Sequence, residues 1–253
     1  MRLFGLGRKE PARAEPAIPG GVRVYAIGDV HGRFDLLRIL LDRIEADDRA
    51  RAPAETHVVL LGDLIDRGPG SAEIIGFFLD ATPGFARFHF LMGNHEEMLL
   101  RLIDAPTETG LAHFLRYGGR ETFESYGASE RLLDFPERHP LQALPNLVPG
   151  AHRHFLRSMD DRLRFGDYLF VHAGIRPDVP IDEQVSADLR WIRGAFLDSE
   201  LDHGVTVVHG HTISERPEFK ANRIGIDTGA YASGTLTALG LEGTGRWLIA
   251  TGA

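Results

Sequence analysis

Three short apolar runs, each followed by a glycine-bracketed polar segment and then a helix-like stretch, constrain the fold of this chain more than any other feature. The runs occupy 22–27, 57–61 and 88–92. Their β-branched and aromatic residues predict strands, and the repeated strand–loop–helix order indicates βαβ units in an α/β fold. Because parallel strands end at the same edge of an open sheet, we expect the polar segments to share one crevice.

The stretches between these strands carry apolar residues at helical spacing. Leu40 and Ile44 belong to the apolar face of a helix predicted over 35–46. Ser71 can cap a second helix, and a third is expected to start near Asn94. Each helix would therefore begin just beyond a polar segment.

The middle of the chain, about 104–160, changes character, with five prolines and several aromatic residues. We interpret it as a mostly helical cap insertion that leans over the crevice of a single catalytic domain spanning 21–253. Two roles for the insertion stay open, substrate selection and an extra packing layer. Beyond it, a helix is expected over 181–197 and strands over 163–171, 205–208, 223–226, 235–241 and 246–250.

Composition excludes several classes of protein. There are no cysteines, so disulfides and thiolate metal sites are ruled out and any metal must have nitrogen and oxygen ligands. No apolar run is long enough to span a membrane, and we expect no membrane partner. The net charge of −8 argues against nucleic acid as the main partner. Residues 1–20 lack the apolar centre of a secretory signal; we expect a flexible leader and a cytoplasmic protein.

Six polar residues stand at the ends of predicted strands or in short glycine-bracketed segments. They are Asp29, His31, Asp63, Asn94, His172 and His211. A single Gly-Asp or Gly-His pair is ordinarily a turn, but several such segments in one chain favour a shared metal site. Imidazole and carboxylate donors suit two divalent ions, with Mn²⁺ as the first expectation and iron, zinc or nickel as alternatives.

Asp63 lies in the middle of this series and is the natural bridge between two cations. In binuclear sites the metals lie about 3.5–4 Å apart and clamp the attacking and leaving oxygens of an in-line displacement. A hydroxide bridging the metals is then the expected nucleophile. His209 lies two residues before His211 and would face the same side of a strand, so it remains an alternative ligand.

Two arginines are expected to bind phosphate, because a guanidinium stays protonated and cannot ligate a metal. The planar donor forks of Arg67 and Arg193 suit bidentate contact with phosphate oxygens. For Arg67 the competing interpretation is a surface ion pair. Arg193 stands on a predicted helix with Arg190 nearby, which weakens its assignment.

His95 follows Asn94 directly, so its side chain should point elsewhere. An imidazolium near neutral pH can donate the proton that the leaving alkoxide of a phosphate ester requires. Asp66 could orient this imidazole. The competing interpretation of His95 is a buried structural histidine with satisfied hydrogen bonds.

The segments 28–32, 62–68 and 93–96 read Gly-Asp-x-His-Gly, Gly-Asp-x-x-Asp-Arg-Gly and Gly-Asn-His-Glu. With the later His-Ala-Gly and Gly-His-Thr elements, the chain resembles the calcineurin-like metallophosphoesterases. The resemblance is to their phosphoprotein phosphatase branch, which includes small bacterial and phage serine/threonine phosphatases. It implies a sandwich of two mixed β-sheets flanked by helices.

The resemblance also implies individual roles. One metal would be held by Asp29, His31 and Asp63, and the other by Asp63, Asn94, His172 and His211. Asp66 and His95 look like the acid dyad, while Arg67, Arg193 and Asn94 would contact the phosphate. Tyr231 is similar to an aromatic residue that lines the pocket. The insertion lacks the long extensions by which eukaryotic relatives recruit regulatory subunits, so we expect this protein to have no regulatory subunit.

These features predict a metal-dependent phosphomonoesterase acting on phosphorylated serine or threonine, with tyrosine left open. Symmetrical diadenosine tetraphosphatases share the scaffold and are the alternative. They often lack the acidic residue of Asp-Arg-Gly and carry Asp after Asn-His, so Asp66 and Glu96 favour the protein phosphatase. A second alternative is a degenerate scaffold that only binds phosphorylated ligands, which the presence of every expected ligand argues against.

Overall fold

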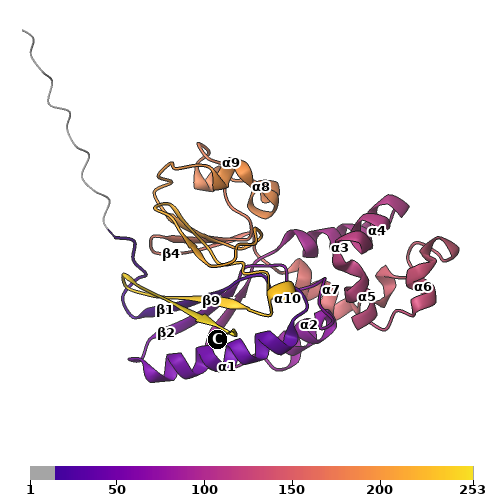
Figure 1. The fold of residues 1–253 in the computed structure, drawn as a ribbon, viewed down its shortest axis with the longest axis horizontal. Coiled ribbons are helices and arrows are strands. Elements are labelled where there is room, and N and C mark those ends of the chain that lie inside the picture. Colours follow the sequence, from indigo (N-terminus) through magenta and orange to yellow (C-terminus); the bar gives the residue numbers. More distant parts are fainter. Residues whose placement is uncertain (1–14, 253) are drawn as a thin grey trace, which may run out of the picture.

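Two five-stranded mixed sheets form the body of the protein (Figure 1). The structure is a computed structural model, and it describes residues 15–252. In order across the first sheet the strands are β10 (Gly245–Ala250), β9 (Thr237–Glu242), β1 (Val22–Ile27), β2 (Glu55–Leu60) and β3 (Arg87–Phe90). Strands β1, β2 and β3 pair in parallel, which confirms the predicted βαβ units.

The second sheet is built almost entirely from the C-terminal half of the chain. Its strands, in order, are β4 (Arg162–Phe165), β5 (Tyr168–Val171), β6 (Thr206–His209), β8 (Arg223–Gly225) and β7 (Glu218–Phe219). The three central strands are parallel, and both edge strands are antiparallel to their neighbours. The carboxyl ends of β5 and β6 therefore lie at one edge of this sheet.

Side-chain alternation along β1 explains how the sheets stack. Val24 and Ala26 point to one face and pack with Phe170 and Ile224 of the second sheet in a buried layer between the sheets. Tyr25 points to the other face, into the core beneath the helices. The expected sandwich of two mixed sheets flanked by helices is confirmed.

Helices cover both outer faces of the sandwich (Figure 1). Helix α1 (Phe34–Ala50) buries Leu37, Leu40 and Ile44 against the first sheet beside α2 (Ser71–Asp80). On the second sheet lie α8 (Ser186–Trp191) and α9 (Gly194–Leu197). A single turn, α10 (Ala230–Ser233), precedes β9.

The middle of the chain is helical and lies to one side of the sandwich (Figure 1). After α3 (Asn94–Asp104) come α4 (Glu108–Phe114), the π-turn η1 (Leu115–Gly119), α5 (Arg120–Ser125), α6 (Glu130–Asp134) and α7 (Gly150–Arg157). Short 3₁₀ turns occupy Pro136–Arg138 and Pro145–Leu147. Phe114, Phe123 and Leu156 extend the core beneath α1 and α2 into this insertion.

Two predicted elements differ from the structure. The strand expected over 163–171 is a hairpin, because Gly166, with φ of 56°, turns the chain between β4 and β5. The helix expected over 181–197 is broken into a 3₁₀ turn at Ile181–Glu183, α8 and α9. Ile192 is extended, with φ −61° and ψ 144°, so the residue after it leaves the helix.

Most of the predicted leader, 1–14, lies outside the described residues. The rest packs against the sandwich: Ile18 is buried between the sheets, and its N–H donates to the carbonyl oxygen of Gly243 at 2.8 Å. The folded body thus begins before residue 21. In the part of the chain from 15 to 252, no helix combines the length and apolar character needed to cross a bilayer.

Candidate metal centre

All six predicted ligands come together at the carboxyl ends of strands from both sheets. Asp29 and His31 follow β1, Asp63 follows β2, and Asn94 opens α3 just beyond β3. His172 follows β5, and His211 follows β6. Every one of the six side chains is buried, with the least buried, His211, 7% exposed. The predicted convergence of these six side chains is therefore present in the structure.

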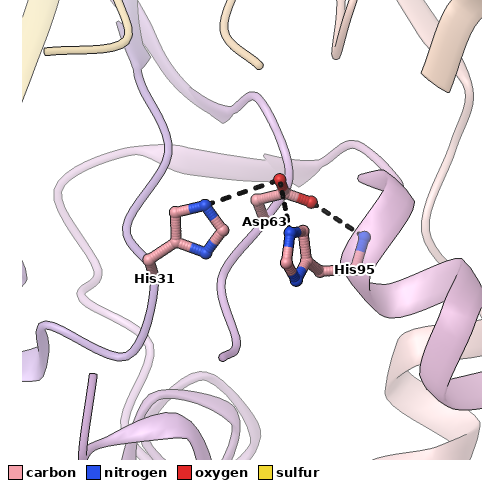
Figure 2. A group of neighbouring side chains, drawn as sticks. All are labelled: His31, Asp63 and His95. Atoms are coloured by element: carbon pink, nitrogen blue, oxygen red, sulfur yellow. Dashed lines mark hydrogen bonds and ion pairs between the residues drawn. The ribbon is translucent and has the colours of Figure 1, made fainter. Parts of the chain in front are cut away.

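Asp63 lies at the centre of the cluster. Its Oδ2 is 3.6 Å from Nε2 of His31 and 3.4 Å from Nε2 of His172. Figure 2 shows the imidazoles of His31 and His95 facing this carboxylate. Two groups of potential ligands share it, one of His31, Asp63 and His95, the other of Asp63, His172 and His211, and the ligand atoms within each group lie within 4.8 Å of one another.

In the group of Asp63, His172 and His211, several atoms with lone pairs lie close together. Nδ1 of His172 lies 2.9 Å from the carbonyl oxygen of Leu61, which can only accept, so Nδ1 carries the proton. When His172 is neutral, as metal binding requires, its Nε2 presents a lone pair 3.0 Å from Oδ1 of Asn94 and 3.2 Å from Nδ1 of His211. Several electron-rich atoms that face one another inside a protein need a cation. The donor set fits a divalent metal.

A backbone hydrogen bond also orients the imidazole of His31 for metal binding. Its Nδ1 donates to the carbonyl oxygen of Ile65 at 2.9 Å, which leaves Nε2 as a ligand atom. Burial lowers the pKa of His31 to about 3, and burial also lowers the pKa of His211 to about 2. Both imidazoles are therefore neutral, the form that binds metal.

The central carboxylate is held ionised by its neighbours. Burial acts to raise the pKa of Asp63, but the facing imidazoles of His172 and His95 outweigh it and hold the pKa well below the usual range. Conversely, although burial opposes it, the Asp63 carboxylate raises the pKa of His172. The cluster thus attracts positive charge at the position that two cations would share.

Asp29 reaches the site but belongs to neither group of three. Its two carboxylate oxygens accept the backbone N–H of His211 at 3.0 and 3.2 Å. Burial and the neighbouring carboxylates of Asp227 and Asp63 raise its pKa well above the usual value. A metal bound beside it would favour the ionised form.

Asp227 is a site residue that the sequence interpretation missed. It is buried beside Asp29, and its Oδ1 accepts the backbone N–H of Gly229 at 2.9 Å. The signal was available, since Asp227 directly follows the apolar residues at the end of β8, as Asp63 follows β2.

The predicted acid dyad is assembled. Nδ1 of His95 lies 2.6 Å from Oδ2 of Asp66, and Asp66 is fully buried. Burial acts to lower the pKa of His95, but Asp63 and the hydrogen bond to Asp66 raise it above the usual value. His95 is also close enough to Asp63 to count among its potential metal ligands, with 3.9 Å between Nε2 and Oδ2.

Arg67 does not form the surface ion pair that was the competing interpretation; it contacts two histidines of the site. Its guanidinium donates to Nε2 of His31 at 2.9 Å and to Nε2 of His95 at 3.2 Å. The same guanidinium lies over the ring of Tyr231, 4.7 Å from its centroid, and that ring meets His31 edge-on. Tyr231 therefore stands beside the centre.

Arg193 stands at the edge of the site, in the break between α8 and α9. It is exposed, and its Nη1 donates to Oγ1 of Thr212, the residue after His211, at 3.3 Å. The indole N–H of Trp191 donates to Oε2 of Glu97 at 2.7 Å, which ties α8 to α3. Arg193 is thus free to reach toward an anion at the centre.

His209, the alternative to His211, is turned away from the cluster. Its Nδ1 donates to the carbonyl oxygen of Gly210 at 3.0 Å, and its ring packs edge-on against Phe196. It belongs to neither group of potential ligands among the described residues. The geometry favours His211.

Backbone strain is concentrated at this site. Among residues 15–252, six non-glycine residues have positive φ, and five of them are His31, Asp63, Asp66, Arg67 and His211. Such left-handed conformations cost about 1–3 kcal/mol each and persist only where the surroundings enforce them. The surroundings must therefore hold these loops firmly.

Glu96 accepts hydrogen bonds that keep the strained loop after β2 in place. Its buried carboxylate accepts the backbone N–H groups of Gly93, Asp63, Leu64 and Ile65, at 3.0, 2.9, 2.7 and 3.3 Å. It thereby joins the loop after β2 to the start of α3, across about thirty residues of sequence. One carboxylate fixes the positions of Asp63 and Asn94 relative to each other.

Replacing Glu96 by Gln is expected to destabilise the metal-free protein by about 2–4 kcal/mol, because the amide NH₂ would face buried N–H donors. Urea unfolding measures the loss. Glu45→Gln is the matched control, since the pair of Glu45 with Arg49 lies at the surface and its loss should change stability by less than about 1 kcal/mol. Equal stability of Glu96→Gln and Glu45→Gln would contradict the role of Glu96.

Comparison with known proteins agrees with this geometry. The family model of calcineurin-like phosphoesterases matches residues 22–233. Serine/threonine-protein phosphatase 1 of Salmonella typhimurium is 29% identical over 85% of this chain and 89% of its own length. The symmetrical bis(5′-nucleosyl)-tetraphosphatase of Methylococcus capsulatus is 32% identical over 61% of this chain. The chain covers only 44% of that relative.

A solved structure of a candidate diadenosine tetraphosphatase superposes with a TM-score of 0.62 over 92% of this chain and 98% of that one, at 19% identity. At this identity the likeness establishes the fold alone. The family model, in contrast, spans most of the chain, including all six predicted ligands. The protein therefore belongs to the calcineurin-like phosphoesterase family.

Proposed function

We propose that the protein is a serine/threonine protein phosphatase that hydrolyses phosphate monoesters with two divalent cations, Mn²⁺ being the first candidate. The observation that carries the proposal is the buried dyad of Asp66 and His95, joined at 2.6 Å. A serine or threonine alkoxide is a poor leaving group and needs a proton as it departs. A nucleoside phosphate leaving an anhydride is already a stable anion and needs none.

The bound cations would supply an acidified water and polarise the phosphoryl group. Asp29, His31 and Asp63 are proposed to hold one cation, and Asp63, Asn94, His172 and His211 the other. This chain's own residues do the rest. Asp66 accepts a hydrogen bond from Nδ1–H of His95 and so fixes Nε2 as the nitrogen that faces the leaving oxygen.

Arg67 and Arg193 are proposed to bind the phosphate oxygens. For Arg67 this requires its guanidinium to turn from Nε2 of His31 and His95 toward the anion. Its position over the Tyr231 ring can be kept during that turn. Arg193 would close on the phosphate from the opposite side, from the edge formed by Thr212.

A second candidate function is the hydrolysis of dinucleoside polyphosphates. The 32% identity to a symmetrical bis(5′-nucleosyl)-tetraphosphatase favours it. That match covers less than half of the relative, whereas the match to the Salmonella phosphatase covers 89% of that protein. Coverage alone does not separate the two candidates, because an asymmetrical bis(5′-nucleosyl)-tetraphosphatase of Bacillus velezensis is also matched over 86% of its length, at 25% identity. The choice of the protein phosphatase therefore rests on the dyad of Asp66 and His95.

A substrate panel tests the choice. Metal-free protein is loaded in turn with manganese, iron, nickel and zinc, and a phosphoserine peptide, a phosphotyrosine peptide and diadenosine tetraphosphate are supplied at equal concentration. We expect the highest kcat/KM for the phosphoserine peptide with manganese, by about tenfold or more over the dinucleotide. A higher kcat/KM for diadenosine tetraphosphate would favour the second candidate, and absence of turnover would remove both.

A further inference from the structure

The cap insertion touches the acid dyad directly. Helix α5 of the insertion lies beside α2 (Figure 1), and the π-turn before α5 meets the strained turn of Asp66 and Arg67. The backbone N–H of Arg67 donates to the carbonyl oxygen of Gly118 at 2.9 Å. Gly118 has φ of 105°, and a Cβ there would stand 2.6 Å from Cγ of Arg67, so only glycine fits.

Four residues further along the insertion, Thr122 reaches Asp66 itself. Its Oγ1 donates to Oδ1 of Asp66 at 2.5 Å and accepts the backbone N–H of Asp66 at 2.9 Å. Ser71 of α2 completes the arrangement, with its Oγ 3.0 Å from Oγ1 of Thr122 and 3.0 Å from the nitrogen of Asp66. All three residues are completely buried.

Counting protons fixes the direction of each hydrogen bond. A hydroxyl has one proton, and Thr122 gives its proton to the carboxylate of Asp66. Ser71 must therefore be the donor in its contact with Thr122, while its oxygen accepts from the Asp66 nitrogen. The backbone N–H of Asp66 is shared between the two hydroxyl oxygens, whereas each hydroxyl proton has a single acceptor.

The Asp66 carboxylate has two hydrogen-bond donors in the described protein. Oδ1 accepts from Thr122, and Oδ2 accepts from Nδ1 of His95. Because the carboxylate is fully buried, solvent cannot replace a lost donor, and an unpaired buried charge is costly. The Thr122 hydroxyl thus holds Oδ1 in place and so directs Oδ2 toward His95.

We propose that Thr122 is a positioning residue for leaving-group protonation, and that the cap insertion thereby completes the acid dyad rather than only covering the crevice. The proposal rests on the proposed function insofar as His95 protonates an alkoxide. Thr122 lies 56 residues from Asp66 in sequence, so packing of the insertion against α2 is required to bring its hydroxyl to the carboxylate.

Substitutions that remove only the hydroxyl test the proposal. Thr122→Val is expected to lower kcat on a phosphoserine peptide by about 10–100-fold, with KM little changed, and kcat on p-nitrophenyl phosphate by less than about threefold. The nitrophenolate leaving group needs little protonation, so a general structural defect would lower both rates alike. Thr122→Ser should restore the peptide rate to within about threefold of the parent.

The matched control is Thr206→Val. Thr206 is also buried, but its hydroxyl has no hydrogen-bond partner among residues 15–252, so both rates should stay within about twofold. If Thr122→Val folds poorly, Thr122→Ser and Thr122→Ala are compared instead, since both lack the methyl group and they differ in the hydroxyl alone. Equal losses on the two substrates, or no loss, would overturn the proposal.

A double-mutant cycle with Asp66→Asn sharpens the assignment. Thr122 is inferred to act through Asp66, so Thr122→Val should have little further effect once that carboxylate is gone. Additive losses would show that Thr122 acts elsewhere and would overturn the proposal.

A readout independent of substrate separates this inference from the proposed function. In ¹⁵N-histidine-labelled, metal-free protein, at a pH high enough to keep the imidazole neutral, His95 should be the Nδ1–H tautomer, with its signal assigned by its loss in His95→Asn. Thr122→Val should weaken that signal and Thr122→Ser should keep it. An unchanged signal in Thr122→Val overturns the positioning role, whereas a protein that cleaves only diadenosine tetraphosphate overturns the proposed function alone.

Discussion

Replacing Asp63 by Asn is expected to lower turnover by about a thousandfold or more on every substrate and to lower the bound metal below two ions per chain. Asp63 is the one residue common to both groups of potential ligands. Loss of its negative charge weakens both cation positions at once, while the side chain keeps its size. Water without a bound cation beside it supplies almost no hydroxide at neutral pH, so activity should collapse.

Metal content measured by mass spectrometry after dialysis against manganese, together with turnover, tests this prediction. Asp182→Asn removes the same charge from a fully exposed position and should leave both quantities at the parent values. The fold of Asp63→Asn is checked by circular dichroism. Parent-level turnover with two metals bound would contradict the role of Asp63 as the shared ligand.

Replacing His95 by Asn is expected to lower kcat on a phosphoserine peptide by about 10²–10⁴-fold, the usual contribution of a general acid. Asn retains a hydrogen bond to Asp66 but cannot deliver a proton. On p-nitrophenyl phosphate we expect a loss of less than about tenfold, because a nitrophenolate departs without protonation. The ratio of the two losses, rather than either alone, identifies the acid.

His154→Asn serves as the control, because His154 is exposed on α7 and should affect neither rate. Metal content must also be measured for His95→Asn, since His95 lies in the same group as His31 and Asp63. Equal losses on both substrates with metal content reduced would assign His95 to the metal instead of the leaving group. Equal losses on both substrates with full metal content would show that His95 is neither the general acid nor a metal ligand.

The centre was predictable wherever a ligand directly follows a strand. Asp63 comes after β2 and His172 after β5, and the carboxyl ends of parallel strands are fixed in space by the sheet. For the same reason Asp227 could have been found: it follows β8 and stands between Gly225 and Gly229, yet the sequence interpretation overlooked it. Local pattern and sheet geometry were sufficient for these residues.

The residues that hold the ligand loops in place through hydrogen bonds could not be predicted from the local sequence. Glu96 was recognised only as part of a motif, although its carboxylate accepts four backbone N–H groups from two separate loops. Thr122 carried no signal at all, being one threonine in a helical insertion. Such roles depend on which distant backbone groups lie opposite a side chain, and that follows from packing.

The types of ligand atom and their order along the chain could be read from the amino-acid sequence alone, because the step from a strand to the loop after it is local. Tertiary structure decided the rest: Arg67 against His31 and His95, Arg193 in a break between helices, and Thr122 on the buried carboxylate of Asp66. These contacts join segments tens of residues apart. Their geometry exists only once two sheets and a helical insertion pack together and hold left-handed turns that the local sequence would not adopt alone.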